Sequence, residues 1–312
     1  MNGPFADVLS RAVAMRAQGG PMRACLVVGA RGSTPQPAGA MMLVDQTGAT
    51  FGTIGGGCVE AELTRRATAM LLSDTTGVHD FILDHDYGWD DGLICGGTLH
   101  VAIGTLPEAD ELVAIEQGVR DRIETRLPIF VQTEGGHAHY DLHIPPRPRL
   151  LIAGGGHIGQ AVARHGLRLD FETVLYDDRA DLLERYAPDG CHTVSGEMAE
   201  SLADAVIDTE TYCVIVTRGH RHDAQALAGV IDRGARYVGM IGSKRKVLLV
   251  RRELMERGVS ESALDAVHAP IGVDIGSVTG EEISLSIAAQ LVQVREQRGW
   301  VTVDGPHLDS PQ

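Results

Sequence analysis

Apolar residues in the second half of the chain come in short runs separated by amphipathic stretches, a pattern typical of strands alternating with helices. Four runs predict buried parallel strands, covered on both faces: residues 149–153, 172–176, 211–216 and 236–241. A final helix is predicted over 280–296, where Thr279 and Glu282 have the spacing of a capping box. Regular alternation of strand and helix predicts a Rossmann-like, doubly wound parallel sheet, so the fold class is α/β.

The first half has a less regular pattern. Helices are predicted at residues 5–18, 59–72 and 108–123. Strands are predicted at residues 22–28, 40–44, 49–54, 78–83 and 98–103. The residues Asp45-Gln46-Thr47-Gly48 lie between two of these strands and indicate a hairpin. We therefore expect an N-terminal α+β domain with a hairpin.

The domain boundary is predicted at residues 145–149, a linker that contains three prolines. Proline interrupts helices and central strands, so neither element is expected to cross this segment. The sequence thus predicts an N-terminal domain over 1–144 and a Rossmann-like domain over 150–300. Residues 301–312 show no periodicity and are predicted to form a tail.

Composition narrows the function classes. The chain has 312 residues, of which 44% are apolar and only 4% aromatic, and its formal charge is −15. Nucleic-acid binders need a basic face, and many stack bases on aromatic side chains, so nucleic acid is not expected as a partner. The acidic surface favours solubility. The negative net charge is still compatible with a local basic pocket that binds one anionic cofactor.

Cysteine use and hydropathy predict a cytoplasmic protein. No apolar run approaches the roughly 20 residues that span a bilayer, so no membrane partner is expected. The N-terminus lacks a basic stretch followed by an apolar block, so no signal peptide is predicted. Five cysteines, an odd number without close pairing, argue against a disulfide framework and favour a reducing compartment.

A dinucleotide fingerprint follows the strand at 149–153. Gly154, Gly156 and Gly159 form the pattern G-x-G-x-x-G between that strand and a predicted helix. Gly154 permits the tight turn, Gly156 lets a phosphate approach the backbone, and Gly159 lets the helix pack on the sheet. The helix N-terminus offers amide groups to the phosphate. The alternative is a Rossmann domain with this turn and no dinucleotide.

Asp177 and Asp178 end the next predicted strand, about 20 residues further on, where an acid recognises ribose hydroxyls. Such an acid prefers NAD to NADP, if either binds. His157 lies inside the glycine turn and is either a ligand contact or an ordinary surface histidine.

A second glycine turn, Gly55-Gly56-Gly57-Cys58, lies between a strand and a helix in the first half. Three consecutive glycines indicate a special backbone conformation or close ligand approach. Cys58 is predicted at the helix N-terminus, where the dipole favours a thiolate and the amides favour a phosphate. Soft sulfur beside an anion cradle suits a ligand with a phosphate and a sulfur-bound metal. The alternative is a small buried cysteine behind a tight turn.

The other cysteines divide into two kinds. Cys95 precedes two glycines, and we expect that it can face Cys58 across one pocket. The 37-residue spacing of these two is unlike paired zinc or iron–sulfur ligands, so no structural zinc is predicted. Cys25, Cys191 and Cys213 lie in or beside apolar strands and are predicted to be core residues.

Polar loops follow the last two predicted strands, at the edge where open α/β sheets bind ligands. His220 and Asp223 are read as an acid/base pair or, alternatively, Asp223 as a helix cap. Ser243 is predicted to cap a helix and to contact a phosphate. Lys244, beside it, belongs to a basic cluster. The alternative interpretation of this cluster is solvated helix surface.

Four groups of segments together resemble the XdhC/CoxI family, the accessory proteins of xanthine dehydrogenase and carbon monoxide dehydrogenase. They are residues 32–35 with the hairpin through Glu60, residues 94–97, residues 151–178, and residues 237–244 with 270–287. The chain departs from the family pattern at Gly280, where a proline is expected, and at His100, where an acid is more usual.

The resemblance implies a chaperone that binds the molybdenum cofactor, as molybdopterin or its cytosine dinucleotide. It implies partners too: a cysteine desulfurase that sulfurates the cofactor and an apo molybdenum hydroxylase that receives it. Cys58 and Cys95 are then candidates near the molybdenum, and both glycine turns are candidates for the phosphate or nucleotide. The resemblance is also compatible with a homodimer, and the sequence leaves the oligomeric state undecided. The competing hypotheses are an NAD-dependent oxidoreductase, with His220 as proton donor, and a Rossmann protein without a small ligand.

Overall fold

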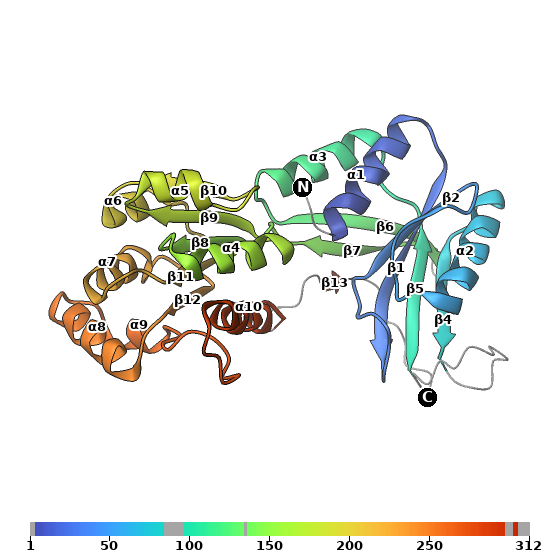
Figure 1. The fold of residues 1–312 in the computed structure, drawn as a ribbon. Helices are drawn as coiled ribbons and strands as arrows, with labels where there is room; N and C mark the ends of the chain where they lie inside the picture. Colours follow the sequence, from blue (N-terminus) through green and yellow to red (C-terminus); the bar gives the residue numbers. More distant parts are fainter. Residues whose placement is uncertain (1–3, 84–96, 134–135, 297–301, 305–312) are drawn as a thin grey trace. The chain divides into compact units, whose positions relative to one another are not determined.

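The computed structural model describes residues 4–83, 97–133, 136–296 and 302–304. They belong to two compact units, Met1–Pro146 with Gly299–Gln312, and Arg147–Arg298 (Figure 1).

The first unit holds three helices and eight strands in its described residues. In chain order they are α1 (Pro4–Ala17), β1 (Met22–Arg31), β2 (Met41–Asp45), β3 (Thr50–Gly52), α2 (Gly57–Leu72), β4 (Gly77–Ile82), β5 (Thr98–Gly104), α3 (Ala109–Arg120), β6 (Thr125–Thr133), β7 (Gly136–Ile144) and β13 (Thr302–Asp304). Five strands form an antiparallel sheet in the order β3-β2-β1-β5-β4, and three form a smaller sheet in the order β13-β7-β6.

Alternation along the central strand gives the five-stranded sheet two apolar faces. Cys25 and Val27 of β1 face one core, which α2 covers with Val59, Leu63 and Ala67. Ala24 and Leu26 face the opposite core, which contains residues of α1, α3 and the β6–β7 hairpin. The sheet is therefore a central layer, and α2, which follows the three-glycine turn, is fixed along one side of it (Figure 1).

The second unit is a five-stranded parallel sheet with helices on both faces. Its elements are β8 (Arg149–Ala153), α4 (His157–Arg168), β9 (Glu172–Asp177), α5 (Ala180–Tyr186), β10 (His192–Ser195), α6 (Met198–Ala203), β11 (Thr211–Ile215), α7 (His220–Val230), β12 (Tyr237–Met240), α8 (Lys244–Glu256), α9 (Glu261–Asp265) and α10 (Gly280–Glu296). The strand order is β10-β9-β8-β11-β12. The order reverses at β8, and a ligand crevice is expected there.

Residues that alternate along these strands divide between two cores. Leu150 and Ile152 of β8 face a core shared with α4, α5 and α10. Leu151 and Ala153 face a core shared with α6, α7 and α8. Both faces of the sheet are thus covered, which explains why its strands are continuous apolar runs in the sequence.

The predicted fold class is confirmed in both units. The predicted second-half strands lie within a residue of β8, β9, β11 and β12, and α10 has the predicted bounds. The hairpin of β6 and β7 and the short elements α5, β10 and α6 were not predicted. The prediction of an unstructured tail from residue 301 is wrong at 302–304, because β13 pairs antiparallel with β7 through Thr302 and His143.

The capping box predicted for α10 is present. The Thr279 hydroxyl accepts a hydrogen bond from the Glu282 amide at 3.3 Å, and the Glu282 carboxylate accepts from the Thr279 amide at 2.8 Å. The helix packs along α4, where Gly280 lies beside Ile158, and so supports the helix that begins at the second-unit glycine turn. Within the described ranges, no helix, α10 included, has the length and apolar composition needed to cross a membrane.

Replacing Thr279 tests the start of α10. Thr279→Ala removes the capping hydroxyl, and we expect the free energy of unfolding to fall by about 1 kcal/mol. Urea denaturation followed by circular dichroism measures the change. Thr279→Ser keeps the hydroxyl and serves as the control. Equal stability of the Ala and Ser variants would show that this cap contributes nothing.

Candidate functional site

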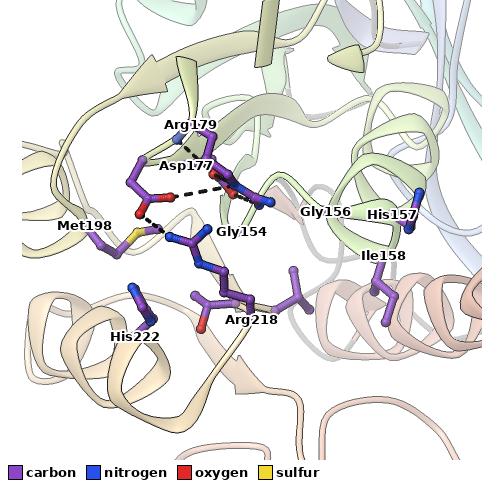
Figure 2. Close-up of a pocket in the computed structure, with 12 residues that line it drawn as sticks. Gly154, Gly156, His157, Ile158, Asp177, Arg179, Met198, Arg218 and His222 are labelled. Atoms are coloured by element: carbon purple, nitrogen blue, oxygen red, sulfur yellow. Dashed lines mark hydrogen bonds and ion pairs between the residues drawn. The ribbon is translucent and has the colours of Figure 1, made fainter. Parts of the chain in front are cut away.

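The carboxyl ends of β8, β9 and β11 surround a pocket in the second unit (Figure 2). Figure 2 shows His157 and Ile158 on one side of it and Met198 and His222 on the other. The pocket is lined by Gly154, Gly156, His157, Ile158, Asp177, Asp178, Arg179, Met198, Val216, Thr217, Arg218 and His222. It therefore lies at the switch point of the sheet and contains both the glycine turn and the acids at the end of β9.

The turn after β8 is closely packed at two of its three fingerprint glycines. Gly154 has a φ of 117°, and a Cβ added there would lie 2.6 Å from the Val216 carbonyl oxygen. A Cβ on Gly159 would lie 1.8 Å from the Gly154 carbonyl oxygen. Gly156, the N-cap of α4, has open space where a Cβ would point. The chain thus fills one side of the turn and leaves the backbone at Gly156 accessible from the pocket.

The Asp177 carboxylate is saturated by donors of its own chain. It accepts from the Gly155 amide (2.7 Å) and from the Arg179 amide (3.0 Å). It also accepts from Arg179 Nε (2.7 Å) and Arg179 Nη2 (2.8 Å). Burial raises the pKa of Asp177, but the hydrogen bonds from Arg179 and Gly155 outweigh it and lower the pKa to about 2. A carboxylate has about four acceptor positions, so this one holds the glycine turn and the end of β9 together.

Asp178, the neighbouring acid, makes a more exposed ion pair. Its Oδ2 lies 2.5 Å from Arg218 Nη2, and its Oδ1 lies 3.8 Å from Arg179 Nε. The side chains of Asp178 and Arg218 are 37% and 50% exposed, whereas that of Asp177 is 5% exposed. Of the two acids predicted to contact ribose, Asp178 is the one that an entering ligand can reach.

The loop after β11 corrects the interpretation of His220 and Asp223. Asp223 is fully buried in α7 and accepts a hydrogen bond from the Thr217 hydroxyl at 2.6 Å. It also forms an ion pair with Lys246 of α8. The N-cap of α7 is Gly219, so Asp223 neither pairs with His220 nor caps the helix. Its role is to anchor the loop that carries Arg218, and His222, not His220, lines the pocket.

Ser243 caps α8, as predicted, because its hydroxyl accepts from the Lys246 amide at 3.3 Å. Lys244 is exposed in the first turn of this helix. Both follow β12 at the same edge of the sheet as the pocket, but neither lines it. Their contact with a phosphate stays a prediction.

The three-glycine turn of the first unit has a backbone conformation that requires glycine. Gly55, Gly56 and Gly57 all have positive φ, at 124°, 77° and 65°. A Cβ on Gly55 would lie 2.5 Å from the Pro35 ring, whereas Gly56 and Gly57 border open space. The predicted special conformation is therefore present, and the outer side of the turn is open.

Glu60 of α2 closes the inner side of this turn. Its Oε1 accepts hydrogen bonds from the Thr53 hydroxyl (2.6 Å), the Ile54 amide (3.0 Å) and the Gly56 amide (2.9 Å). Burial raises the pKa of Glu60, but these hydrogen bonds outweigh it and leave the pKa below its usual value. The Ile54 and Gly56 amides of the turn are thus occupied by a carboxylate of the chain itself.

Cys58 lies in the first turn of α2, directly after the three glycines, and is partly exposed. Cys95 lies outside the described residues. Cys25 and Cys213 are core residues, as predicted, and burial raises the pKa of both thiols to about 12. Cys191 is only half-buried, and burial raises its pKa to about 11. Among the described cysteines, Cys58 is the one that follows consecutive glycines in the first turn of a helix.

The sequence did not single out Arg179, Met198 or His222, which all line the pocket. Arg179 had a usable signal, since it follows the two predicted ribose acids directly. Met198 and His222 had none, because each lies in a helix and reaches the pocket only through the packing of that helix.

Alanine substitutions at two of the fingerprint glycines test whether the backbone is closely packed at Gly159 and accessible at Gly156. Gly159→Ala places a methyl group against the Gly154 carbonyl, so we expect it to lower the melting temperature strongly. Gly156→Ala, the matched control, points into open space and is expected to leave the melting temperature nearly unchanged. Calorimetry measures both. Equal melting temperatures for the two variants would contradict close packing at Gly159.

Acid titration tests the Asp177 carboxylate. Its folded-state pKa is depressed, so its stabilisation is present above about pH 4 and is lost as the pH falls toward 2. We expect Asp177→Asn to lower the free energy of unfolding at pH 7 by about 2 kcal/mol, and the difference to shrink at pH 3 and below. Urea denaturation at several pH values measures this. Asp178→Asn, with its exposed carboxylate, is the control, and a pH-independent effect of Asp177→Asn would contradict the linkage.

Comparison with known families gives two matches that together cover most of the chain. Residues 150–291 match the XdhC Rossmann domain, and residues 15–81 match the XdhC and CoxI family. The first match contains the pocket of the second unit. The second contains the three-glycine turn and Cys58.

Three known proteins are similar to most of this chain. The chain is 27% identical over 93% of its length to the protein YqeB of Escherichia coli K12, of which it spans 46%. It is 24% identical to a probable xanthine dehydrogenase subunit from Bacillus subtilis 168, over 87% of this chain and 92% of that protein. It is 25% identical to the molybdenum cofactor insertion chaperone PaoD of Escherichia coli K12, over 85% of this chain and 80% of that protein.

A solved structure shares the fold along nearly the whole chain. The crystal structure of a xanthine dehydrogenase from Bacillus halodurans matches with a TM-score of 0.76 and 22% identity, covering 97% of this chain and 98% of that one. This match shows a shared fold. The two family matches establish that the chain belongs to the XdhC and CoxI family, with an XdhC Rossmann domain at residues 150–291.

Proposed function

We propose that this protein binds the molybdenum cofactor as cargo and delivers it to an apo molybdenum hydroxylase of the xanthine dehydrogenase type. Family membership supports the proposal, as does the relation to a protein named as a molybdenum cofactor insertion chaperone. The cofactor combines a pterin, a dithiolene-bound metal and a phosphate, so its carrier needs both a soft ligand and an anion site.

The position of Cys58 is the observation that carries the proposal. A partly exposed sulfur directly follows three glycines whose outer side is open, at the start of a sixteen-residue helix. Thiolate sulfur is a soft ligand suited to the metal–sulfur end of the cofactor. Glu60 occupies the Ile54 and Gly56 amides of the turn, so the helix dipole at the start of α2 is what favours an anion here. We propose Cys95 as a second sulfur near the molybdenum.

Both glycine turns are proposed, each within its own unit, as sites for the phosphate or nucleotide of molybdopterin or its cytosine dinucleotide. In the second unit, Gly156 leaves backbone accessible, and the half-exposed guanidinium of Arg218, which pairs with Asp178, is a cation that a phosphate can reach. A cysteine desulfurase is the proposed partner for sulfuration of the cofactor, and transfer is proposed to occur in the cytoplasm, with a homodimer as one arrangement. The protein itself is proposed to turn over nothing.

The oxidoreductase alternative has less support from the pocket. It needs a proton donor beside a bound nicotinamide, and His220 was the sequence candidate. His220 does not line the pocket, and Asp223 is bound to Thr217 and Lys246 instead of orienting it. No specific observation in the described residues therefore favours hydride transfer over cargo binding.

Reconstitution of an apo-hydroxylase tests the proposal. We expect the full chain, loaded with molybdenum cofactor, to raise both the molybdenum content and the activity of the hydroxylase. Cys58→Ser removes the soft ligand, so cofactor retention, read by molybdenum analysis and pterin fluorescence, should fall by about tenfold or more. Cys191→Ser changes a half-buried cysteine of the second unit and is the matched control.

One outcome would contradict the cargo role, and another would contradict the part of Cys58 in it. One is an apo-hydroxylase that gains neither cofactor nor activity from the wild-type chain. The other is equal cofactor retention in Cys58→Ser and Cys191→Ser, which would remove the proposed part of Cys58.

A further inference from the structure

Two surfaces of opposite charge flank β12, the edge strand of the parallel sheet. β12 is the last strand in the order β10-β9-β8-β11-β12. α8 packs on one side of the sheet through Val247 and Leu254. α10 packs on the other side, where Gln290 accepts a hydrogen bond from the Tyr237 hydroxyl of β12 at 2.5 Å. Figure 1 shows α8 and α10 on either side of β12, so the outer surfaces of both helices adjoin the same edge of the unit.

The outward side of α8 combines exposed aliphatic residues with cations. Leu248 is 67% exposed, and Leu249 and Met255 are about half exposed. Spacings of three and four residues place them on one side of the helix with three exposed basic residues, Lys244, Arg245 and Arg252. We call these six residues the basic face. In a chain of formal charge −15, a basic and apolar surface indicates a partner surface that is acidic and apolar.

The loop before α10 and the start of that helix have the opposite combination. Ile275, Val278 and Leu285 are exposed aliphatic residues, and Val278 is 83% exposed. Exposed acids accompany them, since Asp274 precedes Ile275 and Glu281 lies one helical turn before Leu285. We call these five residues the acidic face.

Hydrogen bonds fix the loop of the acidic face to α10. The Val273 carbonyl accepts from the Ser286 hydroxyl at 2.6 Å, and the Val278 amide donates to the Glu282 carboxylate at 2.7 Å. The backbone therefore keeps the aliphatic side chains exposed. An exposed apolar surface with a polar rim, held in place in this way, is typical of an interaction site.

Each face has an exposed ion pair within its own copy. Arg252 Nε lies 3.9 Å from a carboxylate oxygen of Glu256, and Glu281 Oε1 lies 2.7 Å from Arg164 Nη2. Exposed ion pairs contribute little to stability. These side chains can therefore take a partner on another chain without disturbing the fold.

The two faces cannot meet within one copy, because the covered edge of the sheet lies between them. Residues 268–271 cover this edge: the Met240 amide donates to the His268 carbonyl at 3.0 Å, and the His268 amide donates to the Val238 carbonyl at 2.9 Å. Strand pairing at β12 is therefore blocked, and a neighbouring molecule reaches the side chains beside the edge instead.

We propose that the partner is a second copy of this chain, with the basic face of each copy on the acidic face of the other. A two-fold axis beside β12 makes both contacts at once, so the interface is isologous. The exposed aliphatic side chains bury one another, and the cations of α8 meet the carboxylates of Asp274 and Glu281. The inference rests on the homodimer proposed above, but it does not depend on the cargo.

Sedimentation equilibrium of the full chain, without added cofactor, tests the interface. We expect the wild-type chain to be a dimer at micromolar concentration. Leu248→Glu places a carboxylate in the basic face of both copies, opposite acids, so the dissociation constant of the dimer should rise about hundredfold or more. Val206→Glu is the matched control, because Val206 is 65% exposed, follows α6 and belongs to neither face. Circular dichroism confirms that the variants are folded.

Charge reversal in mixed chains gives a readout that another interface would not produce. In one variant, Arg245→Glu and Arg252→Glu make the basic face acidic. In the other, Asp274→Lys and Glu281→Lys make the acidic face basic. Each variant alone brings like charges together and should be monomeric. Mixed in equal amounts, the two should form a heterodimer, because both contacts between them then join opposite charges.

Three results would contradict the proposed dimer. One is a wild-type chain that stays monomeric at micromolar concentration, even if Leu248 then proves to contact phosphatidylglycerol vesicles or an apo-hydroxylase. The others are equal dissociation constants for Leu248→Glu and Val206→Glu, and a mixture of the two reversed variants that stays monomeric. The mass is measured without cofactor, so a failure here is separate from a failure of cofactor transfer.

Discussion

The Asp177 carboxylate ties the end of β9 to the glycine turn that follows β8. Its oxygens accept hydrogen bonds from the Gly155 amide and from the amide and guanidinium of Arg179. One buried group therefore sets the distance between two neighbouring strand ends. The turn has little other freedom, because Gly154 and Gly159 are in close contact with each other and Gly154 also with Val216. The shape of the pocket follows from this bond: backbone is accessible at Gly156, and Asp178 is left at the rim.

In both glycine turns of the chain, backbone amides are hydrogen-bonded to a carboxylate of the chain itself. In each, a carboxylate of the chain accepts amides on the inner side, Glu60 in the first unit and Asp177 in the second. In each, the next glycine borders open space, Gly57 and Gly156 respectively. The carboxylate satisfies these amide donors in place of water. It also orders the turn before any ligand binds, which lowers the entropic cost of binding. Cys58 then distinguishes the first turn from the second.

Hydrophobic periodicity was sufficient for the second unit because its strands are buried on both faces and its helices are long enough to show a stripe. It failed for α5 and α6, which have only seven and six residues. The β6–β7 hairpin was missed although Tyr140, Leu142 and Ile144 alternate with polar residues, because Pro128 interrupts the first strand.

At the site, the motif spacing located the glycine turn and both acids, but spacing carries no information on hydrogen-bond partners. That Asp177 is saturated by Arg179 and Asp223 is buried beneath Thr217 follows only from tertiary packing. The hydrogen bonds of Glu60 were not predicted for the same reason: in the sequence, Glu60 was noted only within a segment that resembles the family.

The pairing of β13 with β7 makes the first unit discontinuous in sequence, since residues 147–298 lie between its two segments. During synthesis on the ribosome, the parallel sheet of the second unit can therefore close before the three-stranded sheet of the first has received its last strand. A nascent chain interrupted near residue 298 would carry a finished Rossmann unit and an N-terminal unit with β7 at the edge of its smaller sheet. Such an edge invites pairing with another chain until Thr302–Asp304 arrives to cover it.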